Sequence, residues 1–157
     1  MRWLCLASSV DFIFASLIFL ILFTYVVSIY SIHASRYLAE QTRVEMEAKA
    51  IEVSELLVKT QGSPYNWEND TSSIAVIGLA DQENVISHSK VVSFSSLSYD
   101  DAKNYLGISR DFHISLVINN STTVFTKGNS TNTSSVSIRR PIIYNSSYGW
   151  LTVRLYG

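Results

Sequence analysis

Residues 12–32 form an unbroken apolar run, FIFASLIFLILFTYVVSIYSI, that contains no charged residue, no Gly and no Pro. About 21 residues at a helical rise of ~1.5 Å span ~32 Å, which matches the hydrocarbon core of a bilayer. The run is longer than the apolar core of about 7–15 residues in a secretory signal. Only a weak cleavage motif follows it, at Ser31, Ala34 and Ser35. The run therefore predicts a transmembrane helix, and a removed signal peptide is the alternative.

The helical pattern continues past the apolar run. No Gly or Pro occurs before Gly62, and residues 36–59 consist mainly of strong helix formers. We therefore predict one helix from about Ser9 to Lys59, which would be ~75 Å long. The predicted segments are 1–32 for the N-terminal segment and transmembrane helix, 33–61 for a continuous extracytoplasmic stem helix, and 62–157 for a head domain.

The stem carries two apolar stripes on nearly opposite sides of the helix. One stripe consists of Val44, Ala48, Ile51 and Val58, with Tyr37 on the same side, and the other consists of Met46, Ala50, Val53 and Leu57. The head of the same chain can cover one stripe. The second stripe then needs another helix or subunit, unless the head wraps around the stem and both stripes belong to one core.

Turn residues and apolar runs divide the first half of the head. Gly62 and Pro64 end the stem helix, and the run 73–80 (SIAVIGLA) predicts a buried strand. A turn at 81–84 and a short strand at 85–87 make a hairpin plausible. Ser98 offers an N-cap for a short helix at 99–106.

Alternating apolar residues mark the second half of the head. The alternation covers Phe112–Ile118, Val136–Tyr144 and Trp150–Tyr156, with a shorter candidate at Val124–Thr126 inside a polar loop. Pro141 indicates that its strand is at an edge or is bulged there. The predicted fold class is therefore α+β, with a long N-terminal transmembrane and stem α-helix and a small antiparallel β-sheet head.

The composition argues against catalysis and against nucleic-acid binding. Twelve Lys and Arg against thirteen Asp and Glu give a net charge of -1, and the single cysteine, Cys5, excludes an intrachain disulfide. His33, His88 and His113 lack ligand-like spacing, and no GxSxG, phosphate-binding Gly-rich loop or HExxH motif occurs. We expect no enzyme activity, no cofactor and no metal site, which favours a structural or binding role.

Six asparagines lie in Asn-X-Ser/Thr acceptor sequences for glycosylation, which are Asn69, Asn119, Asn120, Asn129, Asn132 and Asn145. Five of the six fall in the polar region 119–147. Because such sequences also occur by chance in regions rich in Ser, Thr and Asn, modification is a hypothesis. If the acceptors are used, the head lies outside the cell.

Asp11 is the one charged residue set among apolar neighbours at the start of the run. It can be an interfacial carboxylate that ends the transmembrane segment. It can also be an intramembrane carboxylate that requires a cationic partner, such as the N-terminal ammonium of a neighbouring subunit.

The arrangement of an uninterrupted helix, an acidic residue near its start and a β-rich head resembles type IV pilins and pseudopilins. The string Ala7-Ser-Ser-Val-Asp-Phe12 is similar to the mature N-terminus of archaeal pilin-like proteins, with Asp11 at the fifth position. Short strings in the head, Gly62–Trp67, Ile77–Ala80 and Tyr105–Ile108, are also similar to those proteins. The residues before Ala7 are Cys5 and Leu6, where such proteins usually carry a basic residue followed by Gly or Ala.

The resemblance implies a pilin-like structural subunit or minor pseudopilin of an archaeal type IV pilus-like surface filament. It implies assembly through Asp11 and Phe12, and processing between Leu6 and Ala7. The implied partners are membrane lipid, other pilin-like subunits, a prepilin peptidase and a pilus assembly platform. The N-terminus would be cytoplasmic and the head extracellular. The alternative is a single-pass membrane-anchored protein whose head is a receptor, binding module or accessory subunit.

Overall fold

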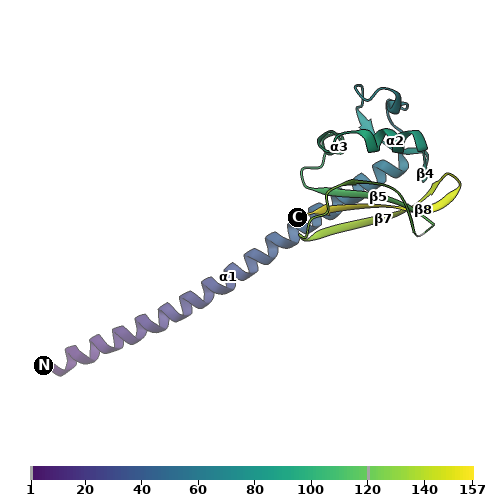
Figure 1. The fold of residues 1–157 in the computed structure, drawn as a ribbon. Coiled ribbons are helices and arrows are strands. Elements are labelled where there is room, and N and C mark those ends of the chain that lie inside the picture. The colour runs from purple at the N-terminus through teal and green to yellow at the C-terminus, as the bar shows by residue number, and fades with distance from the viewer. Residues whose placement is uncertain (1, 120) are drawn as a thin grey trace. The chain divides into compact units, whose positions relative to one another are not determined.

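The computed structural model describes residues 2–119 and 121–157, with side chains from Asp11 onward apart from Ala39. The chain divides into two compact units between Gln41 and Thr42. Helix α1 extends from Arg2 to Lys59 (Figure 1). The predicted continuation of the helix beyond the apolar run is therefore confirmed. The second unit, called the head below, contains the last part of α1 and everything after it.

The head contains two sheets. A small sheet pairs β1 (Gly62–Ser63) with β2 (Val76–Ile77). The main sheet has six strands in the order β3-β4-β7-β8-β5-β6. Its strands are β3 (Ala80–Gln82), β4 (Val85–Ile86), β5 (Phe112–Ile118), β6 (Thr122–Gly128), β7 (Ser135–Tyr144) and β8 (Ser147–Tyr156).

The strands from β5 to β8 pair in antiparallel fashion, as their alternating patterns predict. The prediction of a small antiparallel sheet is nevertheless wrong, because the sheet has six strands and β4 pairs with β7 in parallel. Alternation shows which residues share a face but does not show strand direction. β4 pairs only with Ile143 and Tyr144 at the end of β7, so Pro141 is paired on one side alone, with Trp150 of β8. This agrees with the predicted edge position.

The segment after α1 caps the carbonyl end of that helix. The backbone N–H groups of Leu79 and Asn84 donate to the carbonyls of Leu57 and Val58 in the last turn, both at 3.0 Å. The Ala80 N–H donates to the carbonyl of Thr60, just after the helix, at 3.1 Å. The approach is close, because a Cβ on Gly78 would lie 2.1 Å from the Thr60 oxygen. This crossing interrupts the strand predicted at 73–80, so that β2 and β3 flank Gly78 and Leu79. The carbonyls that a helix end leaves unpaired are thus satisfied.

Three short helical elements complete the head, namely the 3-10 helix η1 (Trp67–Asn69), α2 (His88–Ser96) and α3 (Tyr99–Tyr105). The prediction of α3 is confirmed, and the Ser98 side chain accepts a hydrogen bond from the Asp101 N–H at 3.0 Å. Sequence reasoning missed α2, whose Ser and Val residues have weak helix propensity. Val91 and Phe94 of α2 are buried, so packing stabilises this helix.

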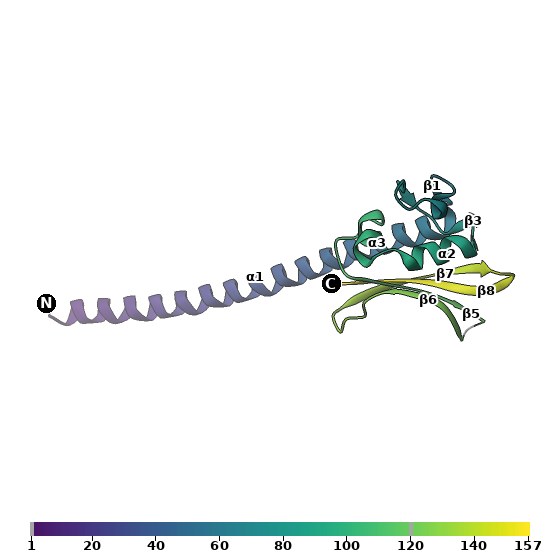
Figure 2. The same cartoon turned by 45° about the horizontal axis from the view of Figure 1, so that its top comes forward.

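The core lies between the main sheet and the helices, which occupy one side of that sheet (Figure 2). Trp67, Phe94 and Phe112 are its largest fully buried side chains. The Trp67 indole donates to the Gly78 carbonyl at 2.9 Å, which satisfies its buried N–H.

Candidate functional site

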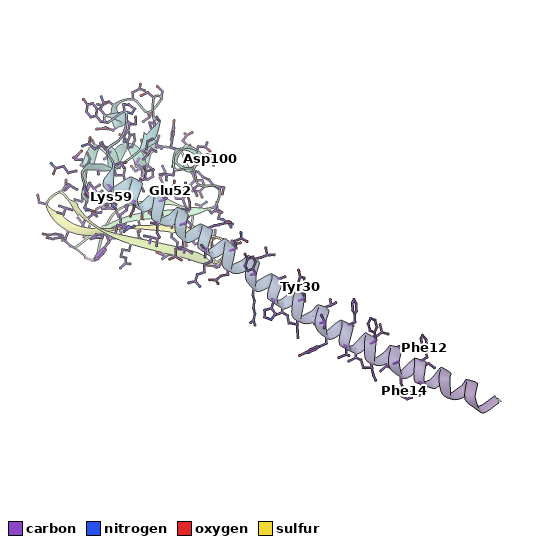
Figure 3. All side chains as sticks on the ribbon, turned by 180° about the vertical axis from the view of Figure 1, so that it is seen from behind. Phe12, Phe14, Tyr30, Glu52, Lys59 and Asp100 are labelled. Carbon is purple, nitrogen blue, oxygen red and sulfur yellow. The ribbon has the colours of Figure 1, made fainter. Side chains whose placement is uncertain are left out.

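The surface of the first unit between Phe12 and Ile32 is apolar and exposed. Phe12, Phe14 and Tyr30 project from the helix (Figure 3) and are 74%, 62% and 76% exposed. By length and composition this helix is able to cross a membrane. Its hydroxyl groups bond within the helix: Ser16 donates to the Phe12 carbonyl at 2.8 Å and Thr24 to that of Leu20 at 2.9 Å. Few polar groups are therefore left to oppose burial in lipid or in a helical bundle.

Asp11 lies one residue before this apolar surface, and its side chain is exposed. Asp11 forms no ion pair with any residue that the structure describes. Leu6 and Ala7 lie within α1, but their side chains are outside the described part of the chain. Asp11 and Phe12 therefore lie next to each other on an exposed part of the helix.

The two stripes of the stem differ in the head unit. The stripe of Met46, Ala50, Val53 and Leu57 is buried, and its members are at most 5% exposed. In the other stripe only Val58 is buried. Val44 and Ile51 are 57% and 38% exposed, and Ala48 is also exposed. The head therefore covers one stripe, and the exposed stripe of Val44, Ala48 and Ile51 is an apolar surface on the stem.

A polar contact fixes the sheet to the stem beside these stripes. Arg140 of β7 donates from Nη2 to Glu55 Oε1 at 3.0 Å and from Nε to Ser54 Oγ at 3.1 Å. Glu55 also pairs with Lys59 at 3.3 Å. Ser54 is fully buried, so Arg140 and the Ile51 carbonyl satisfy its hydroxyl in the core. Sequence reasoning missed this contact, which joins residues about 85 positions apart.

Two lysines are buried in the head, and neither forms a salt bridge with a described carboxylate. Lys90 is 3% exposed, and its ammonium donates to the Gln61 and Ala80 carbonyls at 2.8 and 3.1 Å. Lys127 donates to the Ser95 and Leu97 carbonyls at the end of α2, and burial lowers its pKa. Each of the two side chains is thus held by two backbone carbonyls.

The three histidines do not converge. His33 lies on the exposed surface of α1, and His88 Nδ1 lies 2.5 Å from the Tyr144 hydroxyl. Burial raises the pKa of Tyr144, whereas burial and the nearby Arg154 lower the pKa of His113. Within the part of the chain that the structure describes, no group of three His, Cys, Asp or Glu residues is arranged to hold a metal ion.

The acceptor asparagines are placed at the surface of the head. The side chains of Asn69, Asn119, Asn129, Asn132 and Asn145 are exposed, and Asn120 lies outside the described residues. β6 occupies part of the region predicted to be a polar loop, and only 129–134 connects it to β7. Exposure makes these five sites accessible to a modifying enzyme, and it does not test whether they are modified.

Charged residues are distributed unevenly along the chain, and this signal is present in the sequence itself. No Asp or Glu occurs after Asp111, whereas Lys127, Arg139, Arg140 and Arg154 lie in this last region. β5 to β8 are therefore free of carboxylates. Arg139 and the partly exposed Arg154 make the sheet basic, in contrast to the acidic first turn of α3.

Comparisons with protein-family models, with curated proteins and with solved structures find no match.

Proposed function

We propose that this chain is a pilin-like structural subunit, or a minor subunit, of a surface filament or of the system that assembles it. In this proposal α1 anchors the subunit in the membrane with its N-terminus in the cytoplasm and its head outside. The observation that carries the proposal is that α1 exposes apolar side chains both in the run 12–32 and in the stem stripe of Val44, Ala48 and Ile51.

The position of the stem stripe favours a protein partner over lipid. Val44 lies twelve residues beyond Ile32, which corresponds to roughly 18 Å of helix. The apolar run alone is already long enough for a bilayer, so lipid does not extend to the stripe when the run spans the membrane. Another helix can cover Val44 and Ile51 at a gain of about 25 cal/mol for each Å² of apolar surface removed from water.

Asp11 gives the proposed assembly its electrostatic selectivity. A carboxylate at the edge of a bilayer costs far less than the roughly 2.5–3.5 kcal/mol expected at its centre, so a monomer in the membrane tolerates it. In a lipid-free helical bundle the same carboxylate lies at low dielectric and needs a cation. Cleavage before Ala7 by a prepilin peptidase would supply terminal ammonium groups of neighbouring subunits for that role.

Asp11→Asn tests this proposal. The variant should reach the membrane at the wild-type level but co-purify with filament subunits several-fold less. Glu47→Gln, which changes an exposed carboxylate of the stem, is the matched control and should assemble normally. The proposal would be contradicted if Asp11→Asn assembles at the wild-type level, or if the native protein never associates with pilus-type machinery.

The second candidate function is a membrane-anchored binding or accessory module. The basic sheet without carboxylates favours it, because such a surface suits an anionic partner. In that case α1 is only a tether. Asp11→Asn and wild type would then be indistinguishable in every assembly assay, while Arg139→Glu would abolish partner binding.

A further inference from the structure

A hollow of about 220 Å³ opens on the head at the end of the main sheet. Its lining consists of Asn119, Pro141, Ile142, Tyr148, Gly149 and Trp150. Tyr148 is 80% exposed and Trp150 is 38% exposed, so two aromatic rings border open space. Tyr and Trp rings have an apolar body and a polar end, so they suit a ligand that is itself part apolar and part polar.

The strand pairing fixes the hollow's geometry. Trp150 of β8 lies opposite Val117 of β5 on one side and opposite Pro141 of β7 on the other. The guanidinium of Arg139 lies over the Trp150 ring, 5.9 Å from its centroid, and restrains that ring. The Asn119 N–H donates to the Tyr148 carbonyl at 3.1 Å, which holds Asn119 beside the two rings.

Asn119 is an exposed acceptor asparagine in a turn. It begins the acceptor sequence Asn119-Asn-Ser121, and its backbone φ of 50° belongs to the exposed turn between β5 and β6. Its side-chain amide makes no hydrogen bond with the residues that the structure describes. Among the five described acceptors, Asn119 is the one that lines this hollow.

We propose that Asn119 carries an N-linked glycan whose first sugar packs in the hollow against Tyr148, Trp150 and Pro141. This inference rests on the extracytoplasmic position of the head in the proposed function. The donor is a polyprenyl-phosphate-linked oligosaccharide of the host. The bond between its anomeric carbon and the phosphate oxygen breaks, a bond from that carbon to Asn119 Nδ2 forms, and the amide loses one proton as the lipid phosphate leaves.

The hollow suits a pyranose because a sugar ring has an apolar C–H face and a polar rim. The C–H face packs on an aromatic or proline ring, and the hydroxyl groups remain in water. Covalent attachment makes this contact intramolecular, so a weak contact is populated at high effective concentration. The glycan then covers the exposed aromatic surface of the sheet.

Mass spectrometry of the full chain from native membranes tests the site. Trypsin cleavage after Arg110 and Lys127 gives one peptide that contains both Asn119 and Asn120. Ser121→Ala removes the acceptor at Asn119 alone, and Thr122→Ala removes the one at Asn120 alone, so each variant is the control for the other. We expect the glycan mass to be lost in Ser121→Ala and kept in Thr122→Ala.

Thermal unfolding tests the packing. Loss of the glycan in Ser121→Ala should lower Tm by about 3 °C in the wild-type background and by less than about 1 °C in a Tyr148→Ala background. Thr122→Ala corrects for the change in the turn itself. Because Tyr148 is 80% exposed, Tyr148→Ala should have little effect on the folding of the head.

Four results would overturn the inference. In mass spectrometry these are an unmodified Asn119 beside other, modified acceptors, or no glycan on any acceptor. In thermal unfolding it is an equal change in Tm with and without Tyr148→Ala, and the fourth result is that Ser121→Ala forms a dimer which Tyr148→Ala abolishes. The last result would mean that a second copy occupies the hollow. None of these experiments measures filament assembly, so failure of the glycan proposal is distinguishable from failure of the proposed function, which the Asp11→Asn variant tests.

Discussion

Arg140 of β7 donates from Nη2 to Glu55 of α1 at 3.0 Å, and the same guanidinium bonds the fully buried Ser54. This pair joins the C-terminal hairpin to the stem. Val53 and Leu57 of the same part of the stem are fully buried in the core. Because the guanidinium is planar and contacts two different stem residues, it favours one register of the sheet on the stem.

Arg140→Met should lower the free energy of unfolding of the head by about 1–2 kcal/mol. Hydrogen bonds to charged groups contribute roughly 1.5–3 kcal/mol, and partial exposure of Glu55 reduces the effect. Urea unfolding of the full chain in detergent, followed by far-UV circular dichroism, measures the change. The control is Lys49→Met, whose partner Glu52 is 64% exposed on the same helix, so that this pair should contribute less than about 0.5 kcal/mol. Equal losses in both variants would contradict the specific role of Arg140.

Lys90→Met should destabilise the head by about 1–3 kcal/mol. The substitution leaves the carbonyls of Gln61 and Ala80 without their ammonium donor, and this loss exceeds the relief of burying an apolar side chain. The same urea experiment measures it, with Lys59→Met as the surface control. A more stable Lys90→Met head would show that desolvation of the ammonium outweighs its hydrogen bonds.

His113 should make the stability of the head depend on pH. Its pKa is lowered from the ordinary 6.5 by burial and by Arg154, so the unfolded chain takes up the proton first as pH falls. The contribution of neutral His113 to the free energy of unfolding is therefore complete above about pH 6.5. This contribution is lost as the pH falls from there through the lowered pKa. His113→Gln should remove this dependence.

NMR titration of the imidazole provides the direct measurement. The midpoint of His113 should lie below 6.5 in the wild type and should rise in Arg154→Gln, since the second cause of the shift is removed. A midpoint at or above 6.5 in the wild type would contradict the assigned burial.

The sequence predicts the elements that carry their own periodic signal. The helix α1 is predictable because no helix breaker precedes Gly62, and β5, β7 and β8 are predictable because their residues alternate. The helix α2 is not, since its Ser and Val residues form a helix only under the packing of Val91 and Phe94. The parallel pairing of β4 is not predictable either, because two residues contain no information about strand direction.

The candidate site divides in the same way. The sequence alone shows that Asp11 lies at the start of an apolar run and that no Asp or Glu follows Asp111. The choice between the two stem stripes is not, because both have the same helical period and only the folded head shows which is covered. The Arg140 contact and the hollow at Asn119 depend on strand order, which no local pattern specifies.

The two stripes make a final prediction that separates folding from assembly. Leu57→Ala removes a fully buried side chain and should destabilise the head by about 2–5 kcal/mol, by lost transfer free energy and a cavity. Ile51→Ala lies on the exposed stripe and should change stability by less than about 1 kcal/mol. Its effect should appear instead in association, because a partner helix loses apolar contact.

Ile51→Glu sharpens the comparison, since a carboxylate that must be buried against a neighbouring helix opposes assembly without entering the head's own core. Wild type, Leu57→Ala, Ile51→Glu and the control Glu47→Gln should be compared by urea unfolding and by crosslinking in native membranes. We expect Ile51→Glu to unfold like wild type and to lose crosslinked partners several-fold. A normal crosslinking pattern in Ile51→Glu would mean that the stripe stays in water, and the proposed packing of stems would have to be given up.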